Sequence, residues 1–144
     1  MQLISLRSAI QSDKSFVDNL TREVMGDFVD TTWADNDNRE QYYKDNAFKL
    51  NSTQIICENT QAIGRITLNE APHERVIEAI HLVLHAQGKG IGSALLQQVI
   101  DEAKKHKKSV SLVVLKSNPA VALYLRLGFK VVNETKERFS MKSI

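Results

Sequence analysis

The sequence contains a single cysteine, Cys57, among its 144 residues. A lone cysteine excludes an internal disulfide and suits a reducing compartment. Because Cys57 lies in a strand-like apolar run, we expect a small buried side chain there, with a catalytic thiol as the less favoured alternative. The first twenty residues include charged side chains and lack an apolar core segment, so we expect neither a signal peptide nor a membrane anchor. These shortages predict a cytoplasmic protein.

Neither sign of charge is in excess. Lys and Arg total 19 against 17 Asp and Glu, a net charge of +2, so the chain lacks the broad basic surface that nucleic-acid binding requires. The one charge run, 104–108, falls at the predicted end of a helix, where it complements the helix dipole as a solvated end. His73 and His106 have no Cys or carboxylate partners at ligand spacing. We therefore expect no nucleic-acid partner, no membrane association and no metal.

The first third of the chain is predicted to be mainly helical. A short strand is expected over 3–7, and a helix over 12–25, with Ser12 as its N-cap and Gly26 as its stop. A second helix is expected over about 39–48. The intervening residues 27–38 carry a tryptophan among several aspartates and are predicted to be an irregular loop.

From Thr53 the period of the apolar residues changes to two over the hairpin 53–68, and short apolar runs follow it. Strands are predicted over 53–58, 62–68, 76–84, 110–115, 129–132 and 139–143, with helices over 93–105 and 120–127. The helical crossover makes strand 110–115 parallel to strand 76–84, whereas the hairpin 53–68 is antiparallel. Gly64 within its strand indicates a bulge. The pattern predicts one α+β domain over 1–144 with a mixed sheet, rather than repeated βαβ units.

Three of the six glycines fall in one short segment, Gln87–Gly92, between a predicted strand and a predicted helix. Glycine marks positions where the backbone takes positive φ or where another group approaches closely. A turn of this kind at a helix start directs free backbone N–H groups and the positive end of the helix dipole at one place. The segment is therefore predicted to bind a phosphate or pyrophosphate.

Known phosphate-binding fingerprints narrow the choice of ligand. A P-loop fails because Lys89 lies between glycines at the wrong spacing. A dinucleotide fingerprint fails because Ser93 and Leu95 stand where its last glycine would be. What remains is Gln-x-x-Gly-x-Gly at a strand-to-helix junction, followed some thirty residues later by the segment Asn118–Tyr124 and then by Leu127-Gly128-Phe129.

With these two motifs in order, the chain resembles the GNAT superfamily of acyl-CoA-dependent N-acyltransferases. Residues 76–132 carry the resemblance, and residues about 12–48 match the family's acceptor-side helices only by pattern. The resemblance implies a twisted, mostly antiparallel mixed sheet of about six or seven strands with about four helices. The fourth and fifth strands would be parallel and splayed around the cofactor. Leu84 departs from the family, many of whose members have proline there.

The resemblance also implies a binding site for acetyl-CoA as acyl donor. The glycine-rich turn would hold its pyrophosphate, the strand end before the turn would bind the pantetheine arm, Asn118 would touch the cofactor, and Tyr124 would lie near its sulfur. The implied cofactor-binding residues are Leu82, Val83, Leu84, Gln87, Gly88, Lys89, Gly90, Ile91, Gly92, Ser93, Asn118 and Tyr124.

The implied activity is acetyl transfer from acetyl-CoA to a primary amine of a small molecule or peptide, by direct attack in a ternary complex. The alternative is a non-catalytic acyl-CoA-binding or regulatory module, which the presence of Tyr124 mildly disfavours. A generic nucleotide-binding domain is disfavoured by the failed fingerprints. Small enzymes of this kind are often dimers, so a homodimer is possible.

Three residues are candidates for the chemistry. Tyr124 is expected to protonate or stabilise the leaving thiolate, and the alternative is a tyrosine packed on the helix with its hydroxyl in water. Glu78 and His81 are candidate bases, and the period of two places their side chains on opposite faces of the strand. For both, a solvated or hydrogen-bonded strand residue is the alternative, with the amine losing its proton through water. Backbone N–H groups near Leu82 are expected to stabilise the oxyanion.

The acceptor is expected to approach from the loop around Trp33. Clustered carboxylates and aromatic faces favour a cationic ligand, and a cation–π contact adds ~0.5–2 kcal/mol. The alternative is that Trp33 closes the end of the core while the aspartates cap helices. The candidate acceptor residues are Trp33, Asp35, Asp37, Tyr42 and Tyr43.

Overall fold

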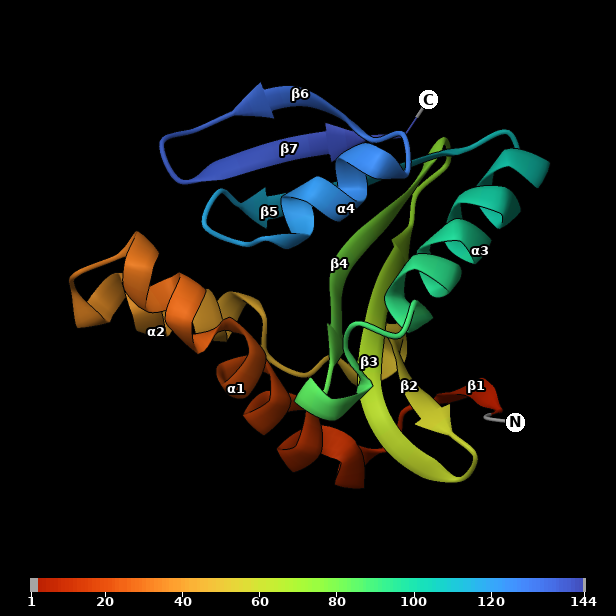
Figure 1. Ribbon diagram of the computed structural model, residues 1–144, viewed down its shortest axis with the longest axis horizontal. Helices are drawn as coiled ribbons and strands as arrows, with labels where there is room; N and C mark the ends of the chain where they lie inside the picture. Colours follow the sequence, from red (N-terminus) through yellow and green to blue (C-terminus); the bar gives the residue numbers. More distant parts are fainter. Residues whose placement is uncertain (1–2, 144) are drawn as a thin grey trace.

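The computed structural model describes residues 3–143, which form one seven-stranded sheet and four α-helices (Figure 1). The strand order is β1-β2-β3-β4-β5-β7-β6, and every neighbouring pair is antiparallel except β4 and β5. The strands are β1 Ile4–Ser8, β2 Thr53–Glu58, β3 Gln61–Glu70, β4 Glu74–Leu82, β5 Ser109–Leu115, β6 Lys130–Glu134 and β7 Arg138–Lys142. The helices are α1 Lys14–Thr32, α2 Asn36–Asp45, α3 Ile91–Lys105 and α4 Ala120–Arg126. The predicted α+β class with a mixed, mostly antiparallel sheet is confirmed.

Helices cover both faces of the sheet. Figure 1 shows α1 and α2 on one side of β3 and β4, and α3 on the other. The main core lies on the α3 side, where the apolar stripe of α3 packs against the central strands and against α4 residues such as Tyr124. A smaller cluster under α1 contains Cys57, which is 6% exposed. The expectation of a small buried cysteine is therefore confirmed.

The parallel strands β4 and β5 separate after a short pairing. They are bonded only over Glu74–Ile77 and Ser109–Leu112. Beyond this point β4 continues to Leu82 and β5 to Leu115, and Figure 1 shows them diverging. The result is a wedge-shaped opening in the middle of the sheet, with unpaired backbone on both of its walls.

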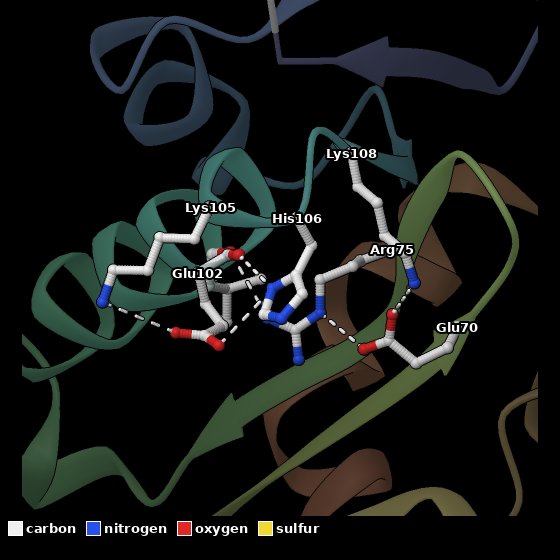
Figure 2. A network of polar contacts seen from close by, with 7 residues as sticks. Glu70, Arg75, Glu102, Lys105, His106 and Lys108 are labelled. Atoms are coloured by element: carbon white, nitrogen blue, oxygen red, sulfur yellow. Dashed lines mark hydrogen bonds and ion pairs between the residues drawn. The ribbon is translucent and has the colours of Figure 1, made fainter.

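A polar network fixes the narrow end of this wedge (Figure 2). Glu70 accepts hydrogen bonds from Arg75 Nε at 2.6 Å and from Lys108 Nζ at 2.9 Å. Arg75 Nη1 also donates to Val99 O at 3.4 Å, which ties the network to α3. The end of β3, the start of β4, the middle of α3 and the residue before β5 are thus held together where β4 and β5 pair.

Helix α1 extends further than its sequence indicates. It passes through Gly26 and ends at Thr32, so the predicted stop at Gly26 is wrong. Glycine in a helix costs about 1 kcal/mol relative to alanine, but Met25 and Val29 continue the buried stripe on either side of it. Burying two such side chains stabilises the helix by about 3 kcal/mol or more, which outweighs the glycine.

The helix boundaries on either side of this region also differ from prediction. The chain enters α1 through a 3₁₀ turn, Gln11–Asp13, where Asp13 accepts from Ile10 N–H at 2.8 Å and pairs with Arg7 at 2.9 Å. Residues 27–38 are not an irregular loop, because α1 takes the first part and α2 begins at Asn36. Asp35 caps α2 by accepting from Asn38 N–H at 2.9 Å. A short polar side chain before a helix start favours this geometry.

The β2–β3 hairpin contains the bulge that Gly64 indicated. Ile56 pairs with Gly64 and Cys57 with Ala62, which leaves Ile63 unpaired next to the glycine. A Cβ at Gly64 would lie 2.3 Å from the His81 carbonyl oxygen. Gly64 therefore allows β3 to pass close to the end of β4.

Among residues 3–143, no helix has both the length and the apolarity needed to cross a bilayer.

Candidate active site

The turn between β4 and α3 presents a row of free backbone donors. Gly88 and Gly90 adopt φ values of 74° and 82°, in the left-handed region that glycine reaches without steric cost. The first helical bond of α3 runs from Ala94 N–H to Gly90 O at 3.0 Å. The N–H groups of residues 88–93 have no acceptor within residues 3–143. They lie at the positive end of a fifteen-residue helix, which is a favourable site for an anion.

This turn opens into a groove of about 790 Å³ that runs along the wedge between β4 and α4. Its walls come from α1, the end of β4, the start of α3, and α4. Of the residues implied by the sequence, Val83 and Lys89 do not line it. The lining residues from that set are Leu82, Leu84, Gln87, Gly88, Gly90, Ile91, Gly92, Ser93, Asn118 and Tyr124.

A second cavity of about 500 Å³ lies on the other side of the wedge, beneath α2. It is lined by residues of β4, β5 and α2, among them Glu78, Tyr42 and Asp45. The two cavities share five lining residues: Met25, Ile80, His81, Asn118 and Tyr124. A ligand in the groove and a ligand in the second cavity would therefore meet beside these five side chains, which we call the junction.

The backbone of β4 also faces the wedge. Val83 N–H donates to Ile63 O of β3 at 2.8 Å. Backbone groups of successive strand residues point to alternate sides, so Leu82 and Ile80 direct theirs away from β3, toward the gap left by β5. The Leu82 N–H therefore points into this gap, where it is free to bond to a ligand.

Glu78 and His81 lie on the same face of the sheet, contrary to the sequence-based prediction. The register passes from Thr67↔Ala79 to Leu68↔Ile77, which leaves Glu78 as an extra, bulged residue in β4. A bulge shifts the alternation by one residue, so both side chains point toward α1 and α2. Consistent with this, Glu78 pairs with Lys49 at 2.9 Å and accepts a short bond from Asn69.

Tyr124 lies at the junction with only 7% of its surface exposed, and its ring meets Phe129 edge-on at 5.8 Å. Burial, with a smaller contribution from nearby Tyr42, raises the pKa of Tyr124 to about 12. The phenol therefore keeps its proton throughout the neutral range. It can act as a hydrogen-bond donor or as an acid, but not as a base.

His81 is also buried at the junction, with 8% of its surface exposed. Its Nδ1 accepts a hydrogen bond from Arg65 Nε at 3.2 Å. Burial and the charge of Arg65 lower the pKa of His81 to about 3. The imidazole is therefore neutral at physiological pH.

Two of the residues implied by the sequence have structural contacts at the groove. Gln87 Nε2 donates to Leu82 O at 3.0 Å and fastens the turn to the end of β4. Asn118 Oδ1 accepts from Ala120 N–H at 2.9 Å and starts α4, while its Nδ2 lies 3.8 Å from Met25 Sδ. Both side chains therefore shape the groove that they line.

The structure separates the five candidate acceptor residues. Tyr42 alone lines the second cavity. Trp33 and Asp35 line a neighbouring cavity of about 530 Å³ that shares Tyr42, Asp45 and Arg138 with the second cavity. Asp37 is exposed in the first turn of α2 and lines neither cavity, and the Tyr43 ring packs under Arg22 at 4.2 Å.

Sequence reasoning missed Arg65, Met25 and Arg138. An arginine in a strand is usually expected to face solvent. Arg65 is instead only 1% exposed, because α1 packs over β3 and covers it. Met25 reads as part of a core stripe. Arg138, whose guanidinium lies 5.2 Å from the Trp33 ring, comes from β7 at the far end of the chain. A charged residue flanked by the apolar pattern of β3 was the only available signal for Arg65.

Comparison with known proteins agrees with this architecture. The chain is 38% identical over 80 residues to UPF0157 protein YqkA of Bacillus subtilis, a match that covers 54% of this chain and only 23% of that protein. Its fold matches the PaiA N-acetyltransferase of Thermoplasma acidophilum in complex with coenzyme A, with a TM-score of 0.80, 20% identity and 98% of each chain covered. It also matches Arabidopsis thaliana Naa50 in complex with the bisubstrate analogue CoA-Ac-MVNAL, with a TM-score of 0.68, 20% identity and 98% of each chain covered. Residues 17–129 match the Acetyltransferase (GNAT) family, and the chain belongs to that family.

Proposed function

We propose that this protein is an N-acetyltransferase that transfers the acetyl group of acetyl-CoA to a primary amine while both substrates are bound. The observation that carries the proposal is the junction, where an anion-binding groove and a second cavity share Tyr124, His81 and Asn118. A transferase that uses direct attack needs two such sites that meet at the reacting atoms.

The groove fits acetyl-CoA in its chemistry. The free N–H groups of residues 88–93 would hold the pyrophosphate. The backbone of Ile80 and the free N–H of Leu82 would bond to the pantetheine arm as an added strand does, while Leu82 O stays bonded to Gln87 Nε2. The acetyl thioester would then lie near Tyr124 and His81, with the acceptor amine entering from the second cavity.

Each step of the proposed acetyl transfer is assigned to a named group of the protein. The amine nitrogen forms a bond to the acetyl carbon and loses a proton, and the carbon–sulfur bond breaks with its electron pair going to sulfur. Glu78 is the proposed proton acceptor, directly or through water, and Lys49 and Asn69 hold its carboxylate in place. The Leu82 N–H stabilises the oxyanion, and Tyr124 supplies a proton or hydrogen bond to the leaving thiolate.

The proposed contacts for the charge of the acceptor differ from those of the sequence-based hypothesis. The cavity that reaches Glu78 contains Asp45, Lys49 and Arg138, so acidic and basic groups alternate in it. Asp35 is bonded as a helix cap. A small molecule or peptide with an exposed amine remains the proposed acceptor, and Asp45 with the face of Tyr42 is the proposed contact for its charge.

The test is a turnover screen with acetyl-CoA over small amines and peptides, which follows free thiol and identifies the acetylated product. We expect amine-dependent thiol release, and a fall of about 10²-fold or more in kcat for Tyr124→Phe and for Glu78→Gln. Glu70→Gln, a matched change at the narrow end of the wedge, should keep wild-type turnover. Tight acetyl-CoA binding without turnover of any amine would favour the binding-module alternative.

A further inference from the structure

Arg65 is a buried cation whose direct contacts are all neutral groups. Its guanidinium donates to four of them: Thr21 Oγ1 at 3.0 Å, Thr67 Oγ1 at 3.0 Å, Asn46 O at 3.1 Å and His81 Nδ1 at 3.2 Å. No carboxylate within residues 3–143 forms an ion pair with it. Burying a charge without a counterion costs free energy, and hydrogen bonds from the N–H groups offset part of that cost. The four acceptors therefore stabilise the buried Arg65 guanidinium.

The two threonine hydroxyls act as acceptors toward Arg65, and this fixes the orientation of its guanidinium. Thr21 Oγ1 donates to Val17 O at 3.0 Å, so toward Arg65 it accepts. Thr67 Oγ1 lies 2.9 Å from Thr53 Oγ1 and can donate there. The network therefore holds the guanidinium in one orientation across β3, with its Nε–H aimed at His81.

This bond determines the state of His81. Arginine has donors only, so Nδ1 must present its lone pair, and the single proton of the neutral ring must lie on Nε2. The imidazolium form has donors at both nitrogens and is incompatible with the bond. The other titratable groups that line the second cavity with His81 are Tyr42, Asp45, Lys49, Glu78, Tyr124 and Arg138, of which Glu78 and Lys49 pair with each other. None of them competes for Nδ1 in the structure.

We infer that His81 is a hydrogen-bond donor rather than a base, and that Arg65 is the positioning residue that gives it this role. His81 Nε2–H would donate to the acetyl carbonyl oxygen at the junction, beside the Leu82 N–H, and the bond would strengthen as negative charge develops on that oxygen. The placement on the carbonyl oxygen rests on the proposed function. It also leaves Glu78 or water as the acceptor of the amine proton.

Two substitutions at His81 separate a donor from a base. The side-chain NH₂ of glutamine can occupy the position of Nε2 and donate from it, whereas leucine can do neither job. We expect His81→Gln to keep kcat within about 10-fold of wild type, and His81→Leu to lose about 10²-fold or more. Equal losses in both variants would overturn the donor role.

Affinity gives a readout that does not depend on turnover. A bond to the acetyl carbonyl should make wild type and His81→Gln bind acetyl-CoA about 3- to 10-fold more tightly than CoA, and His81→Leu should lose this preference. Preference without turnover of any amine would contradict the proposed acetyl transfer but support the donor. Turnover with no His81-dependent preference would contradict the donor alone.

The tautomer is measured directly by ¹⁵N NMR of the histidine rings in the free protein. In wild type we expect His81 to keep a protonated Nε2 and a bare Nδ1 from pH 8 to pH 5. In Arg65→Gln we expect a mixture of the two neutral tautomers, because the guanidinium that holds Nδ1 as an acceptor is gone. A protonated Nδ1 in wild type would overturn the proposal, whether or not the Arg65 variant folds.

Discussion

Gly90→Ala should weaken acetyl-CoA binding through backbone strain alone. Gly90 is the N-cap of α3 at φ 82°, and a Cβ built there has no heavy atom within 4 Å. No clash is therefore expected, but the left-handed conformation costs a non-glycine residue about 1–2 kcal/mol. Alanine favours a different backbone, in which the N–H groups of residues 88–93 no longer converge, and the ligand must restore the strained form.

The magnitude follows from that cost. A penalty of about 1–2 kcal/mol corresponds to a rise of about 5- to 30-fold in the dissociation constant of acetyl-CoA. Isothermal titration calorimetry with acetyl-CoA measures it, and urea unfolding measures the accompanying loss of stability. Gly90→Asp should bind still more weakly, because it adds a negative charge beside the pyrophosphate.

Gly128 provides the matched control. It also adopts positive φ, at 97°, with no heavy atom within 4 Å of a built Cβ, and it does not line the groove. Gly128→Ala should therefore lose a similar amount of stability and keep wild-type affinity. If the two variants bound acetyl-CoA equally well at equal stability, the assignment of the glycine turn as the pyrophosphate site would be refuted.

Three further predictions concern the supports of the site. Gly64→Ala should lower the free energy of unfolding in urea by more than about 2 kcal/mol, because the alanine Cβ would lie 2.3 Å from the His81 carbonyl oxygen. A change below about 0.5 kcal/mol would contradict this close approach. Burial lowers the pKa of His81 in the folded protein to about 3, whereas its pKa in the unfolded chain is about 6.5. The contribution of neutral His81 to the free energy of unfolding is therefore complete above about pH 6.5. It is lost as the pH falls toward 3, at up to ~1.4 kcal/mol per pH unit. His81→Leu should lack that part of the acid slope, and equal slopes in the two proteins would count against a neutral His81. Burial raises the pKa of both Tyr42 and Tyr124 to about 12. The contribution of the two phenols to the free energy of unfolding is therefore complete below about pH 10 and is lost between about pH 10 and 12. The stability of Tyr124→Phe should fall less than that of wild type over this range.

The parts of the site that depend on local chain geometry were predictable from sequence. The spacing of Gly88, Gly90 and Gly92 after an apolar run predicted the turn, and the structure gives positive φ at the first two. The helix between two apolar strands predicted that β4 and β5 are parallel, because a crossover requires it. Gly64 correctly indicated a bulge, since a residue without Cβ marks a close approach of neighbouring strands.

The parts that depend on tertiary packing were not predictable in this way. Gly26 is a reasonable helix stop until the burial of Met25 and Val29 is known. The alternation of Glu78 and His81 fails because the bulge at Glu78 arises from its pairing with β3, which no local pattern in β4 reveals. Arg65 acquires its role only because α1 covers β3 and supplies Thr21.

The proposed acetyl transfer is best tested by amine-dependent turnover of the wild-type protein. Acetyl-CoA is incubated with a panel of amines and peptides, free thiol is followed, and the acetylated product is identified by mass spectrometry. We expect thiol release that requires both the amine and Tyr124, with the acetyl group on the amine nitrogen. Acetyl-CoA binding in the groove with no amine-dependent thiol release across the panel would contradict the proposed acetyl transfer.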